Sequence, residues 1–225
     1  MRVLVGCEHS GAVRRAFRAL GHDAYSCDLL PATDAGTQQH LQCDVLTILK
    51  DGWDLAIFHP DCTYLTCSAE WAYGDGPYHQ KVKSETLVGA ARRAARVEAV
   101  AFVMKLWNAP IKRIAIENPR GHLSRHLGRP QYIQPNWFGD DASKITGLWL
   151  KNLPELRPTK HVAPRMVNGR PRWANQTDSG QNNLPPSEDR WALRAMTYAG
   201  IANAMADQWG GAHIEQPAEQ QGLFA

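Results

Sequence analysis

The sequence has no long apolar run. Across its 225 residues, no stretch approaches the roughly 20 consecutive apolar residues that a membrane-spanning helix needs. The N-terminal segment, residues 1–6, lacks the long apolar region of a signal peptide and is instead typical of a β-strand. These absences exclude a membrane partner and favour a cytoplasmic protein.

Cysteine is scarce as well. The chain has five cysteines at irregular spacing, mostly beside predicted strands. An odd and irregular set is not a disulfide framework and indicates reduced thiols. With 44% hydrophobic and 21% charged residues, the composition is that of a soluble globular enzyme with one domain, or with one domain and a small appendage.

The chain also lacks a complete phosphate-binding motif. The turn Gly6-Cys7-Glu8-His9-Ser10-Gly11 has glycines at P-loop spacing, but Ala12-Val13 stand where Lys-Ser/Thr would be. The pattern GxGxxG is absent too. What remains is a glycine-flanked turn from a predicted strand, residues 2–6, to a predicted helix, residues 12–20, where backbone can closely approach a ligand.

Acidic residues end the next two predicted strands. Asp28 follows the strand 23–27, and Asp44 follows the short strand 40–42. An acid about 20 residues past a glycine turn typically binds the ribose hydroxyls of a nucleoside. We therefore predict a ribose contact for Asp28, with a helix cap or loop acid as the alternative, and an adenine contact for Asp44.

Two further strands end in side chains with reactive chemistry. The apolar segment 53–58 leads into His59-Pro60-Asp61-Cys62-Thr63-Tyr64, and the segment 113–117 ends at Glu117. Because parallel strands place ligands at their carboxyl ends, Cys62 and Glu117 are expected to face one planar substrate.

This pair suits chemistry on a pyrimidine. A thiolate adds to carbon 6 and leaves again readily, and a carboxyl group whose pKa is raised by burial can donate to ring nitrogen 3. One alternative is that Cys62 only fills the core. Another is a thiol hydrolase pair of Cys62 with His59, for which the sequence identifies no orienting third residue.

The remaining patterns predict supporting elements. The glycine- and aromatic-rich segment 67–84 is typical of a mobile lid. The arginines of the following helix, residues 85–108, are expected on a solvated face.

His122 and His126 lie at i and i+4, but no third ligand is near them, so no metal site is predicted. Further predictions are a short helix at 121–127, a hairpin of 131–137 with 145–150, and a helical region at 187–210 interrupted near Gly200.

Charge is unevenly distributed towards the C-terminus. Residues 151–172 hold six Lys/Arg against one acid, a net +5, and residues 173–225 hold two Arg against six acids, a net −4. A local basic stretch in a nearly neutral chain favours an anionic partner over a merely solvated loop. The segment 152–184 shows no sustained periodicity and is expected to be a long ordered loop or a rudimentary subdomain.

The order of these motifs resembles that of the S-adenosylmethionine-dependent cytosine carbon-5 DNA methyltransferases, specifically a short, phage-type branch. The family's Pro-Pro-Cys corresponds to Pro60-Asp61-Cys62, and its Glu-Asn-Val to Glu117-Asn118-Pro119. Its glycine turn and second-strand acid match Gly6–Gly11 and Asp28. Its Gly-Asp-Ile/Val resembles Cys43-Asp44-Val45, and its late Gly-Asn-Ala-Val is similar to Ala202-Asn203-Ala204-Met205.

The resemblance implies an α/β, Rossmann-like class I methyltransferase fold: a mostly parallel sheet, one antiparallel edge strand and helices on both faces. Residues 1–150 and 185–210 would form the catalytic domain, 151–184 an irregular basic insertion or rudimentary recognition segment, and 211–225 a flexible tail. The implied reaction methylates carbon 5 of cytosine through a Cys62 adduct, in a base flipped out of duplex DNA. The implied location is the cytoplasm of a bacterium or a phage-infected host cell.

The residues implied to act fall into three groups. The catalytic residues are Cys62, Glu117 and Asn118. The contacts to S-adenosylmethionine are Gly6, Cys7, Glu8, Ser10, Gly11, Asp28, Leu29, Asp44, Val45, Pro60 and Asn203. The substrate contacts are Pro60, Asp61, Thr63, Pro119, Lys144 and Thr146.

The sequence departs from the family pattern in three places. Asp61 replaces a proline and, if ionised, would raise the pKa of the neighbouring thiol. The bracing Gln-x-Arg-x-Arg is absent, and Lys144 and Thr146 are expected to substitute for it. Residues 152–184 are too few for an independent recognition domain. The alternatives are therefore DNA read with short context, help from a partner or a homodimer, a free cytosine nucleotide as substrate, or a non-catalytic nucleotide- or DNA-binding module.

Overall fold

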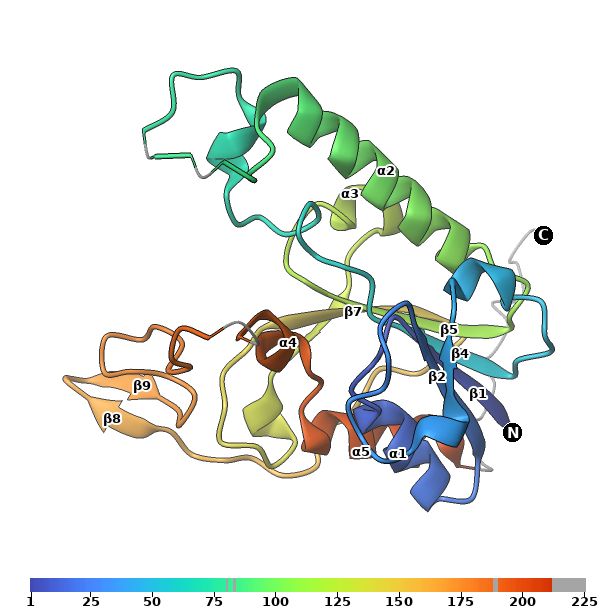
Figure 1. The fold of residues 1–225 in the computed structure, drawn as a ribbon. Helices are drawn as coiled ribbons and strands as arrows, with labels where there is room; N and C mark the ends of the chain where they lie inside the picture. The colour runs from blue at the N-terminus through green and yellow to red at the C-terminus, as the bar shows by residue number, and fades with distance from the viewer. Residues whose placement is uncertain (80, 83, 188–189, 212–225) are drawn as a thin grey trace, which may run out of the picture.

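The computed structural model of the chain describes residues 1–79, 81–82, 84–187 and 190–211 (Figure 1). The acids expected to open the last helical region, at 188 and 189, lie outside those residues, and so does nearly all of the expected tail.

A seven-stranded sheet forms the centre of the molecule, in the order β3-β2-β1-β4-β5-β7-β6. β7 runs antiparallel to both of its neighbours, and the pairings among β1 to β5 are parallel. The predicted Rossmann-like α/β fold is confirmed. The antiparallel strand is not at the edge, however, because β6 pairs along its outer side. The strands are β1 (Arg2–Gly6), β2 (Asp23–Asp28), β3 (His40–Gln42), β4 (Leu55–Phe58), β5 (Arg113–Pro119), β6 (Gln131–Ile133) and β7 (Thr146–Lys151).

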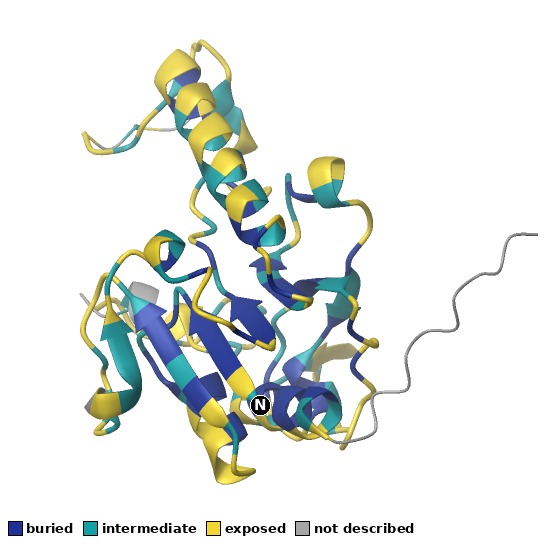
Figure 2. Cartoon of the chain, turned by 90° about the vertical axis from the view of Figure 1, so that its right-hand side faces the viewer, coloured by how far each residue is buried: buried dark blue, intermediate teal, exposed yellow. Residues whose placement is uncertain are grey.

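Helices cover both faces of the sheet (Figures 1 and 2). Leu55 and Ile57 of β4 pack into the core beneath α1 (Ala12–Ala19) and α5 (Ala199–Gly210). Ala56 and Phe58 pack into the opposite core with Val103 and Leu106 of α2 (Gly89–Trp107). Because successive strand residues point to opposite faces, the alternation within one buried strand serves two cores. No helix in the described part of the chain combines the length and apolarity that a bilayer crossing requires.

The other predicted elements are present with shifted ends. The predicted helix at 85–108 begins only at Gly89, which has a positive φ of 57° after extended Val88. The helical region near the C-terminus is divided at 196–198, just before Gly200, where a Cβ would lie 2.0 Å from the Phe138 carbonyl oxygen. The remaining helices are α3 (Ser124–Leu127), α4 (Arg190–Ala195) and four 3₁₀ turns at Thr37–Gln39, Val45–Thr47, Glu70–Tyr73 and Pro135–Trp137.

The basic segment forms a small projection from the body. β8 (Arg165–Val167) and β9 (Arg170–Arg172) make a two-stranded antiparallel hairpin separate from the main sheet (Figure 1). Trp173 follows β9, and its indole N–H donates to the carbonyl of Val162, which precedes β8 (3.3 Å). This bond joins the two ends of the hairpin.

Two of the three arginines predicted on a solvated face of α2, Arg92 and Arg96, are instead turned to the loop after β4, whereas Arg93 is exposed as expected. Arg92 is only 6% exposed, and its guanidinium stacks on the Tyr73 ring at 4.8 Å from the centroid. Arg92 donates to the carbonyl of Thr63 (3.4 Å), and Arg96 donates to the carbonyl of Tyr64 (2.9 Å). The prediction failed because periodicity counts arginine as polar, whereas its planar group can stack and donate inside a loop.

Candidate functional site

The site lies where the strand order reverses, between β1 and β4, which is where open α/β sheets bind ligands. The turn after β1 and the loop after β4 flank this point. A Cβ at Gly6 would lie 2.6 Å from the Phe58 ring and 2.8 Å from Val45. Glycine is therefore required for the two chain segments to come this close.

The Cys62 loop is a tight turn held from several directions. The Asp61 carboxylate accepts from the backbone N–H (3.0 Å) and the hydroxyl (2.7 Å) of Thr63. The Cys62 carbonyl accepts from the N–H groups of Leu65 and Thr66, each at 3.0 Å. The side-chain amide of Asn118 donates to the Pro60 carbonyl (2.8 Å). None of these bonds uses the sulfur, so the thiol is positioned by its backbone.

Glu117 lies on β5 beside His59, the residue that follows β4. Nδ1 of His59 is 3.1 Å from Oε2 of Glu117, and the two side chains are 9% and 12% exposed. Strand alternation points Asn118 to the other side, where it binds the Cys62 loop as described. Among the predicted catalytic residues, Asn118 is therefore placed as a positioning residue, and Glu117 is the one turned towards polar groups.

The pKa of Glu117 differs from expectation. Burial acts to raise it, but the hydrogen bond from His59, the charge of Lys144 and a hydrogen bond from Thr146 outweigh burial and hold the pKa below its usual range. Glu117 is therefore a buried carboxylate and not the neutral carboxyl group that was predicted. Burial alone would raise the pKa, as predicted, but the donors and the positive charge around this side chain have the larger effect.

The pKa of Cys62 is raised. Burial is the main cause, followed by the charges of Asp61 and Glu117, while Lys144 acts in the opposite direction. The predicted effect of Asp61 is confirmed. Because Lys144 lowers the pKa of both Cys62 and Glu117, the thiol, the carboxylate and the ammonium group occupy one electrostatic environment.

Lys144 and Thr146 reach this site from the segment that opens β7. The Lys144 backbone N–H donates to the side chain of Gln134 (2.9 Å), and its Nζ donates to the Arg194 carbonyl (3.0 Å). Thr146 is 4% exposed and pairs across the strands with Pro119. Both residues stand beside Glu117, where they were predicted to replace the missing arginines.

The turn after β1 is closed by its own side chains. Glu8 is 5% exposed, and its carboxylate accepts from the N–H groups of Val13 (2.8 Å) and Arg14 (3.5 Å) in the first turn of α1. Ser10 is also buried and donates to Glu8 (3.3 Å). Since Glu8 already satisfies the helix N-terminus, a ligand phosphate would meet a carboxylate there.

Acidic groups converge on the same turn. The pKa of Cys7 is raised to about 12 by burial and by the charges of Asp28, Asp44 and Asp61. These carboxylates lie at or after the ends of three different strands, and their common effect on one thiol shows that all three are near Cys7. Asp28 and Asp44 also accept from the backbone N–H of Leu30 (3.0 Å) and Leu46 (2.9 Å), respectively.

The other predicted cofactor contacts are spread more widely. Leu29 is 72% exposed directly after Asp28, whereas Val45 is 4% exposed and packs in the core on the α2 side. Pro60 is buried, and Asn203 is exposed on α5. Gly11 has a φ of 67° at the start of α1. Of this group, only Gly11 and Pro60 belong to the two loops that flank the switch point.

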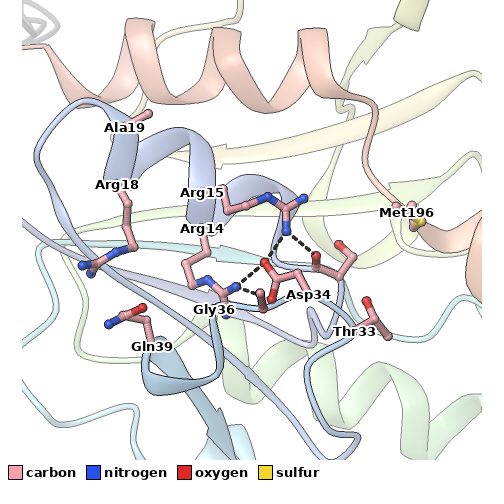
Figure 3. Close-up of a pocket in the computed structure, with 11 residues that line it drawn as sticks. Arg14, Arg15, Arg18, Ala19, Thr33, Asp34, Gly36, Gln39 and Met196 are labelled. Carbon is pink, nitrogen blue, oxygen red and sulfur yellow. Dashed lines mark hydrogen bonds and ion pairs between the residues drawn. The ribbon is translucent and has the colours of Figure 1, made fainter.

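A cleft of about 670 Å³ lies between α1 and residues 33–36 of the loop after β2 (Figure 3). Buried Arg14, 1% exposed, donates to Asp34 (2.6 Å) and to Ser26 (2.8 Å), and Arg15 also pairs with Asp34. Neither Cys62 nor Glu117 lines this cleft. Arg14 and Arg15 bind Asp34 and so tie the loop after Asp28 to α1. We call these three residues the structural clamp, and the cleft lies beside it.

Asp34→Asn is expected to destabilise the protein by about 3 kcal/mol, because it leaves the buried Arg14 charge without a counter-charge. Burial acts to raise the pKa of Asp34, but hydrogen bonds from Arg14 and Arg15 outweigh it and hold the pKa low. The ion pair therefore stabilises the fold above the ordinary carboxyl pKa and is lost as pH falls through the lowered one. Urea unfolding at neutral and acid pH should show a difference in unfolding free energy between the unmodified protein and the variant that is smaller in acid. An equal difference at both pH values would contradict a stabilising role of this ion pair.

Two contacts were missed by sequence reasoning. The His59–Glu117 pair follows from register, because each residue comes next after Phe58 and Ile116, which are paired in β4 and β5. The contacts of Arg92 and Arg96 with the Cys62 loop gave no sequence signal, since their acceptors there are the carbonyls of Thr63 and Tyr64. The rings of His122 and His126 lie 5.3 Å apart. Among the described residues, no group of three or more His, Cys, Asp or Glu is arranged to hold a metal.

No protein-family model and no curated protein sequence matches the chain. Among solved structures, one similar to it is a mutant of DNMT2 from Spodoptera frugiperda, at 14% identity and a TM-score of 0.39, covering 76% of this chain. This chain spans 57% of the length of that protein. So distant a likeness assigns no family, and the function has to be argued from the residues of this chain.

Proposed function

We propose that this protein transfers a methyl group from S-adenosylmethionine to carbon 5 of cytosine. The observation that carries the proposal is the shared environment of Cys62 and Glu117. They come from adjacent parallel strands, the charge of Glu117 acts on the Cys62 thiol, and Lys144 acts on both. A nucleophile for carbon 6 and a hydrogen-bonding group for nitrogen 3 are the two things that activation of carbon 5 requires.

The residues at the switch point fit a nucleoside that carries positive charge rather than phosphate. Glu8 fills the helix N-terminus, and Asp28, Asp44 and Asp61 act together on Cys7. This acidic surrounding would repel a dinucleotide or nucleoside triphosphate, and it would favour a sulfonium with a free ribose. Asp28 would bind the ribose, Asp44 the adenine amino group, and the backbone at Gly6 the methionyl portion. S-adenosylmethionine would supply the electrophilic methyl group.

The chain's own groups would then act in order. The Cys62 thiol loses its proton to solvent, and the resulting thiolate adds to carbon 6. Glu117, held by His59 and Thr146, would contact nitrogen 3, while Asn118 keeps the Pro60 carbonyl and hence the Cys62 turn in place. After carbon 5 has taken the methyl group, its proton passes to solvent water, the carbon–sulfur bond breaks and the thiolate is regenerated.

DNA is the substrate that the charge distribution favours. The hairpin of β8 and β9 carries Arg165, Arg170 and Arg172, with Lys160 shortly before it. A basic hairpin that projects from the catalytic body is suited to contact a phosphate backbone. A free cytosine nucleotide would need no such projection.

Transfer of labelled methyl groups to different acceptors tests the proposal. The protein should label duplex DNA that contains cytosine and leave duplex poly(dA)·poly(dT) unlabelled. Labelling of dCMP in preference to DNA would establish the free-nucleotide alternative. DNA containing 5-fluorocytosine should trap a covalent adduct, because the fluorine cannot leave as a proton does. Transfer to neither acceptor and no adduct would indicate a binding module without catalysis.

Replacing Arg165, Arg170 and Arg172 by glutamine is expected to weaken DNA binding while leaving S-adenosylmethionine binding unchanged. Each lost phosphate contact should reduce the slope of log affinity against log salt by about 0.9. A salt titration of fluorescently labelled duplex would measure the slope. Glutamine at the exposed residues Lys50, Lys105 and Lys112, which lie outside the hairpin, is the charge-matched control. Equal slopes for the hairpin variant and the unmodified protein would show that the hairpin does not touch DNA.

A further inference from the structure

A second pocket lies at the edge of the sheet where β5 ends, beside the proposed catalytic site. It has a volume of about 280 Å³, and its walls come from the end of β5, from β6 and the turn after it, and from the start of β7. Because β7 runs antiparallel to both neighbours, its first residues meet the carboxyl ends of β5 and β6, at the same edge as Glu117. The lining residues are Arg120, Tyr132, Ile133, Gln134, Trp137 and Ile145.

The wall formed by Arg120 is fixed to the Cys62 loop. Gly121, the next residue, pairs by an isolated β-bridge with Thr66 of that loop. A Cβ at Gly121 would lie 2.0 Å from the Leu65 carbonyl oxygen, so the two segments are in close backbone contact. The guanidinium of Arg120 makes no hydrogen bond or ion pair with the residues that the structure describes. A cation is therefore held beside the nucleophile's loop and is available to an anion.

The wall formed by Ile145 is fixed to the residues around Glu117. Ile145 lies between Lys144 and Thr146, and both of these act on the Glu117 carboxylate. The side chain of Gln134, in the same pocket, accepts from the Lys144 backbone N–H (2.9 Å). Ile145 is 52% exposed, so this apolar wall is open to a partner.

The third side of the pocket adjoins the basic segment. The Trp137 carbonyl accepts from the backbone N–H groups of Thr159 (3.0 Å) and Lys160 (3.1 Å). These two residues lead into the hairpin of β8 and β9, which is proposed to contact the phosphate backbone. The pocket is therefore bordered by the Cys62 loop on one side and by the start of the DNA-contacting segment on another.

The lining suits a nucleobase. The rings of Tyr132 and Trp137 offer faces on which a flat heterocycle can stack, and the unpaired guanidinium of Arg120 can bind the phosphate attached to it. The volume lies just below the roughly 300 Å³ at which pockets for drug-sized ligands begin. One ring system is thus accommodated, and a stack of two bases is not.

We propose that this pocket binds the nucleobase next to the target cytosine in the same DNA strand, with Tyr132 and Trp137 against its rings and Arg120 on the neighbouring phosphate. The inference rests on the proposed function. Stacking is tolerant of sequence because every base has a π face, so the pocket would hold the strand in register without selecting a particular base. It would supply a contact beside the cytosine that the short segment 152–184 does not provide as an independent domain.

Photocrosslinking tests this contact without relying on turnover. 5-Iodouracil would be placed in turn at each position on either side of the methylated cytosine of a duplex or, if no cytosine is methylated, at every position. Peptide mass spectrometry would then identify the crosslinked residue. We expect the position next to the cytosine to crosslink to Tyr132 or Trp137. Ile145→Asn, which places a polar group in the apolar wall, should lower the yield about 10-fold, whereas Val97→Asn, at an exposed position of α2, should leave it unchanged.

A double-mutant comparison tests whether the base and the ring meet. An abasic site next to the cytosine should lower kcat/KM for methyl transfer about 10-fold, and Tyr132→Leu should do the same on intact DNA. Since both changes remove one contact, their combination should cost no more than either alone. Additive losses would mean that Tyr132 acts through the fold and would overturn the inference. If Tyr132→Leu does not fold, Ile145→Asn takes its place in the same comparison.

Failure of the inference and failure of the proposed function give different results. Methyl transfer to DNA without a crosslink to Tyr132 or Trp137 from either neighbour of the cytosine would overturn the inference and leave the proposed function intact. A crosslink to one of these rings without transfer to any DNA would reject the proposed chemistry and support the pocket as a nucleobase site.

Discussion

Cys62→Ser is expected to lower methyl transfer by on the order of 10⁴- to 10⁶-fold, as loss of a covalent nucleophile does in other enzymes. The hydroxyl has nearly the shape of the thiol but ionises far less readily and attacks carbon 6 poorly. Asp61, Asn118 and the Cys62 carbonyl hold the loop without using the sulfur, so the fold and cofactor binding should be retained. Single-turnover transfer of a labelled methyl group, with calorimetric titration of S-adenosylmethionine, would measure both.

Cys67→Ser is the matched control. Cys67 is the exposed cysteine of the same loop, and its substitution should change neither transfer nor trapping by 5-fluorocytosine. Adduct formation that persists in Cys62→Ser and disappears in Cys67→Ser would move the nucleophile to the second thiol. Equal activity of both variants would remove covalent catalysis altogether.

Glu117→Gln should slow transfer by about 10²- to 10⁴-fold, because an amide cannot pass a proton to nitrogen 3. The same substitution should make the thiol easier to ionise. The Glu117 charge raises the pKa of Cys62, so its removal lowers that pKa and increases the thiolate fraction at a given pH. Slower transfer together with faster alkylation by iodoacetamide is a combination that general damage to the site would not produce.

Alkylation should be followed at Cys62 by peptide mass spectrometry, since Cys67 also reacts. Glu155→Gln, which removes an exposed carboxylate in the basic segment, serves as the control and should leave both rates as they are. A Glu117→Gln variant that transfers at the original rate would exclude Glu117 from the mechanism. Unchanged alkylation would mean that the carboxylate and the thiol do not influence each other.

The sheet was predictable because its strands carry strong local signals. β4 and β5 are short apolar runs that end at polar residues, and the glycine turn marks the end of β1. The pairing of β6 with β7 was predicted as a hairpin of 131–137 with 145–150. The sequence did not show that β7 would lie between β5 and β6 instead of at the edge of the sheet, because its neighbours are set by the whole sheet and not by the strand itself. The division between α4 and α5 was visible in Gly200, although the sequence could not reveal that the Phe138 carbonyl requires a glycine there.

The sequence predicted that Cys62 and Glu117 follow neighbouring strands, but it did not predict the direction of the Glu117 pKa shift. Cys62 and Glu117 follow from strand ends, and the effect of Asp61 follows from simple charge. The pKa of Glu117 depends on two hydrogen-bond donors, His59 and Thr146, and on the charge of Lys144. These groups come from the loop after β4 and from the segment that opens β7, and only the fold brings the two segments together. Glu8 likewise belongs to the predicted turn, yet its engagement with α1 emerges only from the helix geometry.

The bonds from α2 to the Cys62 loop have a mechanical consequence. Arg92 and Arg96 donate to the carbonyls of Thr63 and Tyr64, immediately after Cys62, and Arg96 also binds Glu70. The backbone that carries the Cys62 sulfur is thereby linked to the long helix. A displacement of α2 would move this loop with it, so the position of the sulfur would depend on the position of the helix.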